Sequence, residues 1–268
     1  AAGHGRSVPG RMPAGPAAPV GSPPVTADEL RALLRRDPMR TALLFDFDGS
    51  LAPIVEDPAA ATPADGALAL LDQLAVHYRK VAVVSGRPRS FLARRLGPGV
   101  DLSGVYGLET RVDGVHADHD EAAQWRPVIA EAAASARLPD GVVVEPKGLS
   151  LTVHFRTVPH AGEAVSQWAD EVAARTGLEV RAAKASFELH PPIPIDKGTS
   201  VRELAAGCDV VVYVGDDVGD LPAFAALDEL REAGLGVAKV AAGGAELPDA
   251  LAAAADIVVA GPDAVVEL

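Results

Sequence analysis

Short apolar runs recur in the first and last thirds of the chain, and between them apolar residues follow a helical spacing. Uninterrupted apolar runs are typical of strands that are buried on both faces of a parallel sheet. Strands that alternate with helices in this way predict an α/β fold, with a parallel sheet covered by helices on both faces. The strands predicted from these runs are residues 42–46, 81–85, 210–216 and 257–260.

The predicted helices carry their own boundary signals. Thr26 and Glu29 form a capping-box pattern before the first helical run, so we expect order to begin at Thr26. A proline at the favoured first position predicts a helix that opens at residues 62–63. A further short helix is expected at residues 91–96. The apolar stripe of the helix after residue 63 consists of Leu68, Leu71 and Leu74.

The middle of the chain has a different pattern. Residues 142–145 and 149–156 predict two strands that flank a hairpin turn at residues 146–148. In the second of these strands apolar and polar residues alternate, and residues 186–190 alternate again, as in an open antiparallel sheet. We therefore expect a small α+β domain whose polar sheet face is available to a ligand. Its predicted helices are residues 121–137 and 164–175.

These patterns divide the chain into a tail, a core and an insertion. Residues 1–25 are rich in Pro, Gly and Ala and lack hydrophobic periodicity, so we expect a disordered tail. Residues 26–118 and 191–268 are expected to form the α/β core. Residues 119–190 are expected to form the smaller domain inserted into it.

The amino-acid composition limits which kinds of molecule the protein is expected to bind. The chain has 268 residues, of which 49% are hydrophobic, enough for a substantial core. Its formal net charge of −13 argues against non-specific binding to nucleic acid or to an anionic membrane. The sequence has neither an apolar run of membrane-spanning length nor the apolar segment of a typical secretory signal. The single cysteine, Cys208, fits a reducing compartment, so we expect a cytoplasmic protein.

Two aspartates, Asp46 and Asp48, follow the first predicted strand and precede Gly49. Open α/β sheets bind ligands outside the carboxyl ends of their strands, where these carboxylates would lie. One could attack as a nucleophile while the other transfers a proton. An ordinary strand-to-turn junction with solvated or capping aspartates fits the same pattern.

Three further segments place polar groups at predicted sheet ends. Ser85 could hold a phosphoryl oxygen together with backbone amides, although a plain N-cap serine is the simpler interpretation. Lys197 stands just before a predicted helix, as a functional cation or as an exposed surface lysine. The turn after strand 210–216 holds clustered carboxylates, which repel and need a cation or full solvation. Oxygen-rich ligation favours Mg²⁺, and a solvated acidic loop is the alternative. The carboxylates of this turn are Asp216, Asp217 and Asp220.

Taken in order, these four segments resemble the motifs of the haloacid dehalogenase (HAD) superfamily of phosphohydrolases. Residues 46–50 match the first motif, Ser85 the second and Lys197 the third. Residues 215–217 with Asp220 match the fourth. The resemblance implies a HAD-type, Rossmann-like parallel sheet core with an inserted smaller α+β cap domain.

Other segments resemble the trehalose-6-phosphate phosphatase family within that superfamily. In this family the cap closes over the sugar, and a Glu-x-Lys pair with a further glutamate holds it. The resemblance therefore implies substrate-binding roles for Glu145, Lys147 and Glu188, and for Arg87 of the second motif. The matching segments are residues 51–55, 85–87, 144–148, 154–156, 187–191 and 213–217. The chain departs from the usual family residues at Ser50, Pro146, His190, Gly219, Leu221 and Pro222.

The family mechanism is a Mg²⁺-dependent phosphate transfer in two steps. Asp46 would attack phosphorus and form an aspartyl-phosphate, while Asp48 would protonate the leaving sugar oxygen and then activate water. Mg²⁺ would be held by the side chains of Asp46 and Asp216 and by the backbone carbonyl of Asp48. Phosphoryl oxygens would be bound by Ser85 and Lys197, and waters around the metal would be supported by Asp217 and Asp220.

The expected activity is hydrolysis of trehalose 6-phosphate to trehalose and phosphate in trehalose biosynthesis, with a functional link to a trehalose-6-phosphate synthase. Two alternatives stay open. One is a HAD phosphatase for another sugar phosphate, such as sucrose phosphate or a glycerate-linked sugar phosphate. The other is a catalytically weak, regulatory sugar-phosphate-binding protein, and the presence of Asp48 argues against it, because a sensor has no need of an acid/base group.

Overall fold

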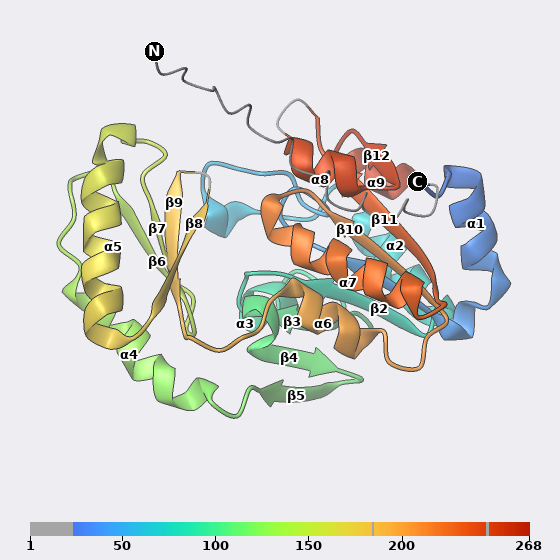
Figure 1. Cartoon of the computed structure of the whole chain (residues 1–268), viewed down its shortest axis with the longest axis horizontal. Helices are drawn as coiled ribbons and strands as arrows, with labels where there is room; N and C mark the ends of the chain where they lie inside the picture. Colours follow the sequence, from blue (N-terminus) through green and yellow to red (C-terminus); the bar gives the residue numbers. More distant parts are fainter. Residues whose placement is uncertain (1–23, 184, 245–246) are drawn as a thin grey trace, which may run out of the picture.

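The computed structural model describes residues 24–183, 185–244 and 247–268, which contain two β-sheets (Figure 1). The larger sheet has the order β12-β11-β10-β1-β2-β3-β4-β5, and the smaller one the order β6-β7-β9-β8. Neighbours from β12 to β3 pair in parallel, and β4 and β5 extend the sheet antiparallel at one edge. The strands of the larger sheet are β1 (Thr41–Phe45), β2 (Lys80–Val84), β3 (Asp101–Gly104), β4 (Glu109–Val112), β5 (Val115–Asp118), β10 (Val210–Gly215), β11 (Gly236–Ala242) and β12 (Ile257–Val259).

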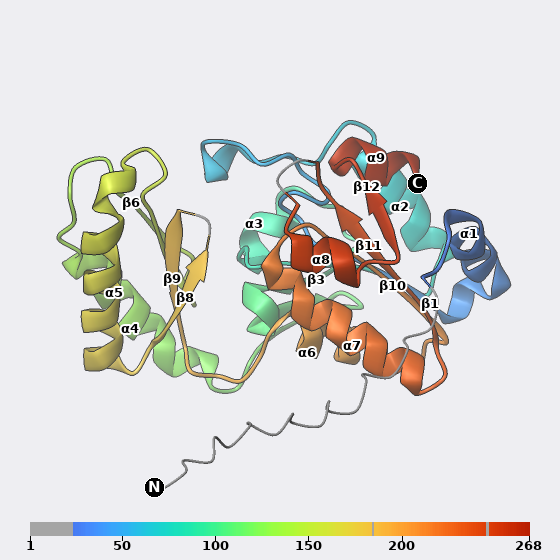
Figure 2. The same ribbon diagram turned by 45° about the horizontal axis from the view of Figure 1, so that its top comes forward.

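The larger sheet is buried on both faces because its central strands carry apolar side chains at successive positions. In β1, Leu43 packs into one core and Leu44 into the other. Helices α1, α2, α3 and α9 cover the first face, and α6, α7 and α8 cover the second (Figure 2). This arrangement confirms the predicted α/β class. The helices are α1 (Ala27–Arg36), α2 (Ala67–His77), α3 (Arg89–Ala93), α6 (Lys197–Leu204), α7 (Leu221–Glu232), α8 (Asp249–Ala254) and α9 (Pro262–Glu267).

Local signals at the helix ends were partly right. The capping box predicted at Thr26 is present, with both reciprocal hydrogen bonds to Glu29. The predicted start of α2 at residues 62–63 is wrong, because its N-cap is Gly66, which has a φ of 82°. The predicted stripe is wrong at Leu68, which is 43% exposed, whereas Leu71 is buried.

The smaller sheet has one apolar and one polar face, as its alternating sequence predicts. The predicted hairpin is formed by β6 and β7. Across the four strands, register aligns Glu145 with Thr152, Thr152 with Glu188, and Glu188 with Arg181. Paired residues share a face, so these four lie opposite the face on which Leu151 packs against α4 and α5. The elements of this part are α4 (Ala122–Ser135), β6 (Val143–Pro146), β7 (Leu151–His154), α5 (Gly162–Thr176), β8 (Glu179–Ala183) and β9 (Ser186–His190).

The chain passes between the two sheets twice, from β5 to α4 and from β9 to α6 (Figure 1). The predicted boundaries between core and insertion, at 118/119 and 190/191, fall on these connections and stay a prediction. Apart from residues 24 and 25, the predicted disordered tail at residues 1–25 lies outside the described residues. In the described part of the chain, no helix combines the length and apolar character needed to cross a membrane.

Candidate active site

Asp46 is the first residue after β1, at the carboxyl end of this strand and beside its neighbour β10. Its backbone N–H donates to the Val214 carbonyl of β10 at 2.8 Å. Its side chain is buried, and its Oδ1 lies 2.9 Å from Nζ of Lys197. The alternative of a solvated aspartate is therefore wrong for this position.

Asp216 follows β10 and lies directly against the turn after β1. Gly49 of that turn has a φ of 82°, and a Cβ built there would be 1.9 Å from the Asp216 Oδ2 atom. Only glycine provides both this backbone conformation and this close approach. The turn therefore brings the first and last motifs of the sequence side by side.

Asp220 and Lys197 hold the acidic loop in place. Asp220 is fully buried, and its Oδ1 accepts from Lys197 Nζ and from the Tyr213 hydroxyl, both at 2.6 Å. Its Oδ2 accepts the backbone N–H groups of Asp216 at 2.9 Å and Asp217 at 3.1 Å. Lys197 is 6% exposed, so its interpretation as a surface lysine is wrong. Burial alone would lower the pKa of Lys197, but the two facing carboxylates raise it well above its usual value.

These carboxylates fit a divalent cation. Oxygens of Asp46, Asp216 and Asp220 lie within 4.8 Å of one another. The Asp216 Oδ1 atom is buried without a hydrogen-bond partner in the described part of the chain. Burial raises the pKa of Asp46 and Asp216, and repulsion from neighbouring carboxylates raises both further. A hard cation would supply the missing positive charge and take the free oxygen as a ligand.

This cluster differs in membership from the predicted metal site. Asp220, predicted to act on metal-bound water, belongs to the carboxylate group, whereas the Asp48 side chain does not. The predicted role of the Asp48 backbone carbonyl stays a prediction. Asp217 is exposed, and its Oδ1 caps the short helix η5 (Val218–Asp220) by accepting from Val218 N–H at 2.6 Å.

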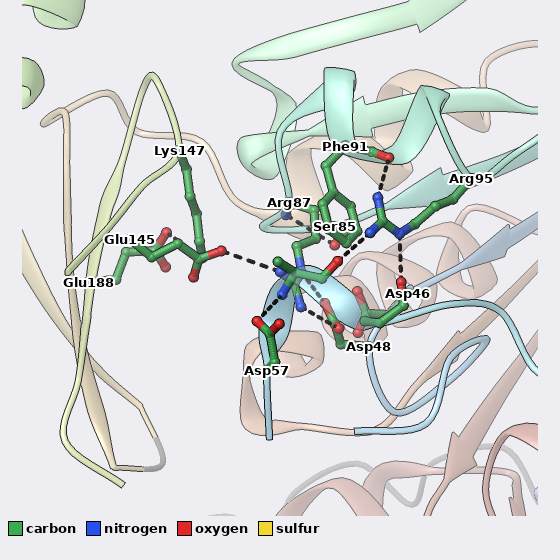
Figure 3. A network of polar contacts seen from close by, with 12 residues as sticks. Asp46, Asp48, Asp57, Ser85, Arg87, Phe91, Arg95, Glu145, Lys147 and Glu188 are labelled. Carbon is green, nitrogen blue, oxygen red and sulfur yellow. Dashed lines mark hydrogen bonds and ion pairs between the residues drawn. The ribbon is translucent and has the colours of Figure 1, made fainter. Parts of the chain in front are cut away.

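The Asp48 side chain is held by Arg87, which also reaches the smaller sheet (Figure 3). Arg87 Nε and Nη2 donate to the two Asp48 oxygens at 2.7 and 2.8 Å, a bidentate ion pair. Arg87 Nη1 lies 3.4 Å from Oε1 of Glu145 on β6. Arg87 is therefore a bridge between the carboxyl end of the larger sheet and the polar face of the smaller one.

Ser85 follows β2 and is 2% exposed. Its Oγ accepts the Arg87 backbone N–H at 3.2 Å. Its interpretation as a plain helix N-cap is wrong, because the N-cap of α3 is Pro88. The hydroxyl thus lies at the sheet end beside the residue that contacts Asp48.

On the smaller sheet, Glu188 is 6% exposed and is engaged on both oxygens. Its Oε1 accepts from the Ser150 hydroxyl at 2.7 Å and lies 3.7 Å from Lys147 Nζ. Its Oε2 accepts from the Tyr106 hydroxyl at 2.7 Å. Burial would raise the pKa of Glu188, but the Lys147 ammonium and the two hydroxyls lower it below its usual value.

Glu145 lies in the same polar face, and its pKa is lowered as that of Glu188 is. Its Oε2 is 2.9 Å from His154 Nε2. Burial would raise its pKa, but the hydrogen bond from His154 and the charges of Lys147 and Arg87 lower it. Glu145, Lys147 and Glu188 point toward one another on the side of Arg87 away from Asp48 (Figure 3). The predicted substrate-binding residues therefore form one group.

Sequence reasoning assigned no role to four residues that complete the site. Ser150 and His154 occupy polar positions of the alternating strand that predicted a ligand face, so this pattern could have indicated them. Tyr213 lies in an apolar run and looks like a core residue, while Tyr106 follows β3, a strand without a predicted signal. Their contacts depend on long-range packing that the local pattern does not contain.

Comparison with known proteins gives the family. The sequence model described as trehalose-phosphatase matches residues 44–249, most of the chain. The chain belongs to the trehalose-phosphatase family. Trehalose-phosphate phosphatase from Mycobacterium ulcerans is 40% identical in an alignment 220 positions long, which covers 75% of this chain and 55% of the relative. The chain thus spans about half the length of the curated relatives that it matches.

Solved structures agree with this family and with the predicted fold. The C-terminal domain of C. albicans trehalose-6-phosphate phosphatase superposes with a TM-score of 0.74 at 27% identity, covering 91% of this chain and 96% of that one. A sugar phosphatase described as a subclass IIB member of the HAD superfamily superposes with a TM-score of 0.52 at 17% identity, covering 85% and 96%. The second likeness concerns the fold alone. The predicted HAD-type fold is therefore confirmed.

Proposed function

We propose that the protein hydrolyses trehalose 6-phosphate to trehalose and phosphate. One observation carries the proposal: a buried carboxylate–lysine cluster lies at the ends of β1 and β10, and Asp48, two residues after Asp46, is joined through Arg87 to a polar row on the smaller sheet. The cluster suits phosphoryl transfer, and the row suits a ligand rich in hydroxyl groups. Membership of the trehalose-phosphatase family supports this substrate.

In the first step, Asp46 attacks the phosphorus atom of the substrate. A bond forms between a carboxylate oxygen and phosphorus, and the bond from phosphorus to the sugar oxygen breaks. The leaving sugar oxygen takes a proton from Asp48, so trehalose departs as a neutral alcohol. Asp46 carries the phosphoryl group as an aspartyl-phosphate.

In the second step, water attacks the phosphorus atom of the aspartyl-phosphate. Asp48, now a carboxylate, accepts a proton from this water. The bond between phosphorus and the Asp46 oxygen breaks, which releases phosphate and restores the Asp46 carboxylate. The sum of both steps consumes one water for each sugar phosphate, and the enzyme returns to its starting state.

Charge is the main obstacle to the first step, because a carboxylate approaches a phosphate dianion. Lys197 offsets this repulsion with an ammonium 2.9 Å from Asp46. We assign to the Ser85 hydroxyl the donation of a hydrogen bond to a phosphoryl oxygen. We propose Mg²⁺ as the cofactor, held by Asp46 and Asp216 with the Asp48 backbone carbonyl. When bound, it neutralises charge on the transferred phosphoryl group.

Arg87 has to change partners during this cycle. Both Asp48 oxygens accept hydrogen bonds from Arg87, the pairing of a charged carboxylate, whereas the first step requires Asp48 to carry the proton that it gives to the leaving sugar oxygen. A phosphate dianion is a bidentate partner for a guanidinium and competes for it. Arg87 thus binds the substrate phosphate and frees Asp48 in the same movement.

We propose that residues 119–190 form the cap domain that recognises the sugar. Glu145 and Glu188 accept hydrogen bonds from sugar hydroxyls, and Lys147 donates to them. Closure of this domain over the ligand would exclude water from Asp46. A HAD phosphatase for another sugar phosphate is the second candidate, because the same groups would bind hydroxyls of other sugars.

We also propose a cytoplasmic enzyme that acts after a trehalose-6-phosphate synthase. A single cysteine in 268 residues suits a reducing compartment. The substrate has to be made by a glycosyl transfer onto a sugar phosphate, which is the reaction class of such a synthase.

A substrate panel with phosphate detection tests the proposal. Wild-type protein with Mg²⁺ is given trehalose 6-phosphate, sucrose 6-phosphate, glucose 6-phosphate and p-nitrophenyl phosphate. We expect the highest kcat/KM with trehalose 6-phosphate. Asp46→Asn should lose at least about 10³-fold in kcat on each substrate, because the nucleophile is gone, while its Tm stays near that of wild type. A higher kcat/KM for another sugar phosphate would contradict the substrate, and near-normal turnover by D46N would contradict the mechanism.

A further inference from the structure

Tyr106 has an unusual backbone for its position. It lies in the short helix η3 (Val105–Gly107) directly after β3, and its φ is 60°. The preceding Val105 has a φ of 47°. Positive φ is strained for residues with a Cβ, above all for a β-branched one, and persists only where the surrounding structure imposes it. Such strain commonly marks a functional constraint.

The backbone of this turn is attached to the segment that carries Ser85 and Arg87. Tyr106 N–H donates to the Ser85 carbonyl at 3.1 Å, and Val105 N–H donates to the Arg87 carbonyl at 3.0 Å. The tyrosine ring passes over Gly86, where a Cβ would lie 2.7 Å from the Tyr106 hydroxyl oxygen. Tyr106 is therefore built onto the end of the larger sheet, beside the proposed phosphate site.

The far end of the same side chain belongs to the smaller sheet. The Tyr106 hydroxyl donates to Glu188 Oε2 at 2.7 Å. The guanidinium carbon of Arg181 lies 5.3 Å from the ring centroid, within the range of a cation–π contact. Burial, followed by the charge of Glu188, raises the pKa of Tyr106 well above 10, so the phenol stays protonated and donates. One side chain thus spans from Ser85 to the proposed sugar site.

This contact fixes the orientation of the Glu188 carboxylate. Ser150 holds one carboxylate oxygen and Tyr106 the other, so rotation of the group would break a hydrogen bond. A carboxylate has about four acceptor positions, so positions remain for sugar hydroxyls after these two bonds are made. The donor on Oε1, Ser150, comes from the turn between β6 and β7, whereas the donor on Oε2, Tyr106, comes from η3 after β3 of the larger sheet.

We propose that Tyr106 is a positioning residue for sugar recognition, which sets Glu188 relative to Ser85 and so couples the sugar site to the phosphate site. The inference rests on the proposed function. Tyr106 acts through Glu188 and has no part in the bond changes at phosphorus. Its removal therefore harms substrates with a sugar and spares substrates without one.

The test is Tyr106→Phe, which keeps the ring over Gly86 and removes only the hydroxyl. We expect kcat/KM for trehalose 6-phosphate to fall about tenfold or more, the effect of losing a hydrogen bond to a charged group, with p-nitrophenyl phosphate within about twofold of wild type. Tyr78→Phe removes a phenol after α2, away from the site, and should match wild type on both substrates. Thermal unfolding of each variant accompanies the kinetics.

A double-mutant cycle separates positioning from simple packing. In a Glu188→Ala background, Tyr106→Phe should cost less than about twofold, because Tyr106 acts through the missing carboxylate. Equal losses on both substrates, additive losses in the cycle, or an unchanged kcat/KM for trehalose 6-phosphate would each overturn the inference while leaving the proposed function intact. Failure of the wild-type protein on every sugar phosphate of the panel would overturn both.

Discussion

Carboxylates shape both halves of the proposed site, yet their pKa values shift in opposite directions. Burial raises the pKa of Asp46 and Asp216, where Lys197 is the buried ammonium beside them in the described part of the chain. Burial acts on Glu145 and Glu188 as well, but there the neighbouring cations and hydrogen-bond donors outweigh it and the pKa falls. The opposite pKa shifts of the two halves therefore come from the amount of neighbouring positive charge, and not from how deeply the carboxylates are buried.

This difference assigns a separate task to each half. The carboxylates at the end of the larger sheet outnumber the Lys197 ammonium beside them, so they are suited to receive a metal and then to act on phosphate. The carboxylates of the smaller sheet are already compensated, so they are suited to accept hydrogen bonds from a neutral sugar without a charge penalty. Variants that change charge should therefore affect the two halves differently.

The largest effect is expected from Lys197→Met. Asp46 and Asp220 would lose their shared ammonium, so kcat/KM should fall at least about 10³-fold on sugar and aryl phosphates alike. Removing one partner of a buried ion pair should also cost about 3–5 kcal/mol of unfolding free energy, measured in urea. Lys239→Met is the matched control, because Lys239 is also buried and pairs with Asp228 at 2.7 Å outside the site. The control should lose stability and keep activity. A K197M enzyme whose kcat/KM is within tenfold of wild type would contradict the proposed difference between the two halves.

A smaller effect is expected on the pH dependence of stability without metal. The pKa values of Asp46 and Asp216 are raised from 3.8 to about 7 and about 10, so above pH 6.5 the folded state holds protons that the unfolded chain has released. Stability then falls as pH rises, by up to about 1.4 kcal/mol per pH unit for each proton. The window starts at pH 6.5 because His190, whose pKa is lowered from 6.5, acts with the opposite sign below it.

Urea unfolding in EDTA between pH 6.5 and about pH 8 measures this slope. Mg²⁺ should flatten it, because a bound cation favours the ionised carboxylates, and Asp216→Asn should reduce it in EDTA. The matching change on the smaller sheet, Glu145→Gln, should leave the slope unchanged, because the pKa of Glu145 is lowered from 4.5 and lies below the window. Stability that is constant or rises with pH in EDTA would contradict the assignment of an uncompensated cluster.

Local sequence signals predicted the parts of the fold that depend on neighbouring residues. The buried strand β1, the capping box at Thr26 and the alternating hairpin of β6 and β7 all follow from short patterns. The predicted start of α2 is wrong because Ala64 N–H donates to the Leu51 carbonyl at 2.8 Å, a tertiary contact that holds this segment outside the helix. β11 was not predicted, because its alanines and glycine give little strand signal and the sheet supplies its stability.

In the candidate site, too, local sequence patterns predicted only part of the structure. Asp46, Lys197 and Asp216 stand at strand and helix ends, so their convergence follows from the order of the elements. The hydrogen bonds of Tyr213 to Asp220 and of Tyr106 to Glu188 do not follow from this order. Tyr213 looks like a core residue in the sequence, and the position of Tyr106 depends on a left-handed backbone. Motif positions could be predicted, whereas the side chains that orient them required the folded structure.

The most direct test of the two-task account crosses Asp216→Asn and Glu188→Ala with two substrates, trehalose 6-phosphate and p-nitrophenyl phosphate. D216N should lower kcat/KM on both by a similar factor of about 10³ or more, because it acts on the phosphoryl group that they share. E188A should lower kcat/KM about 100-fold for trehalose 6-phosphate and leave the aryl phosphate within about threefold of wild type. Equal losses on both substrates in E188A, or a loss confined to trehalose 6-phosphate in D216N, would contradict it.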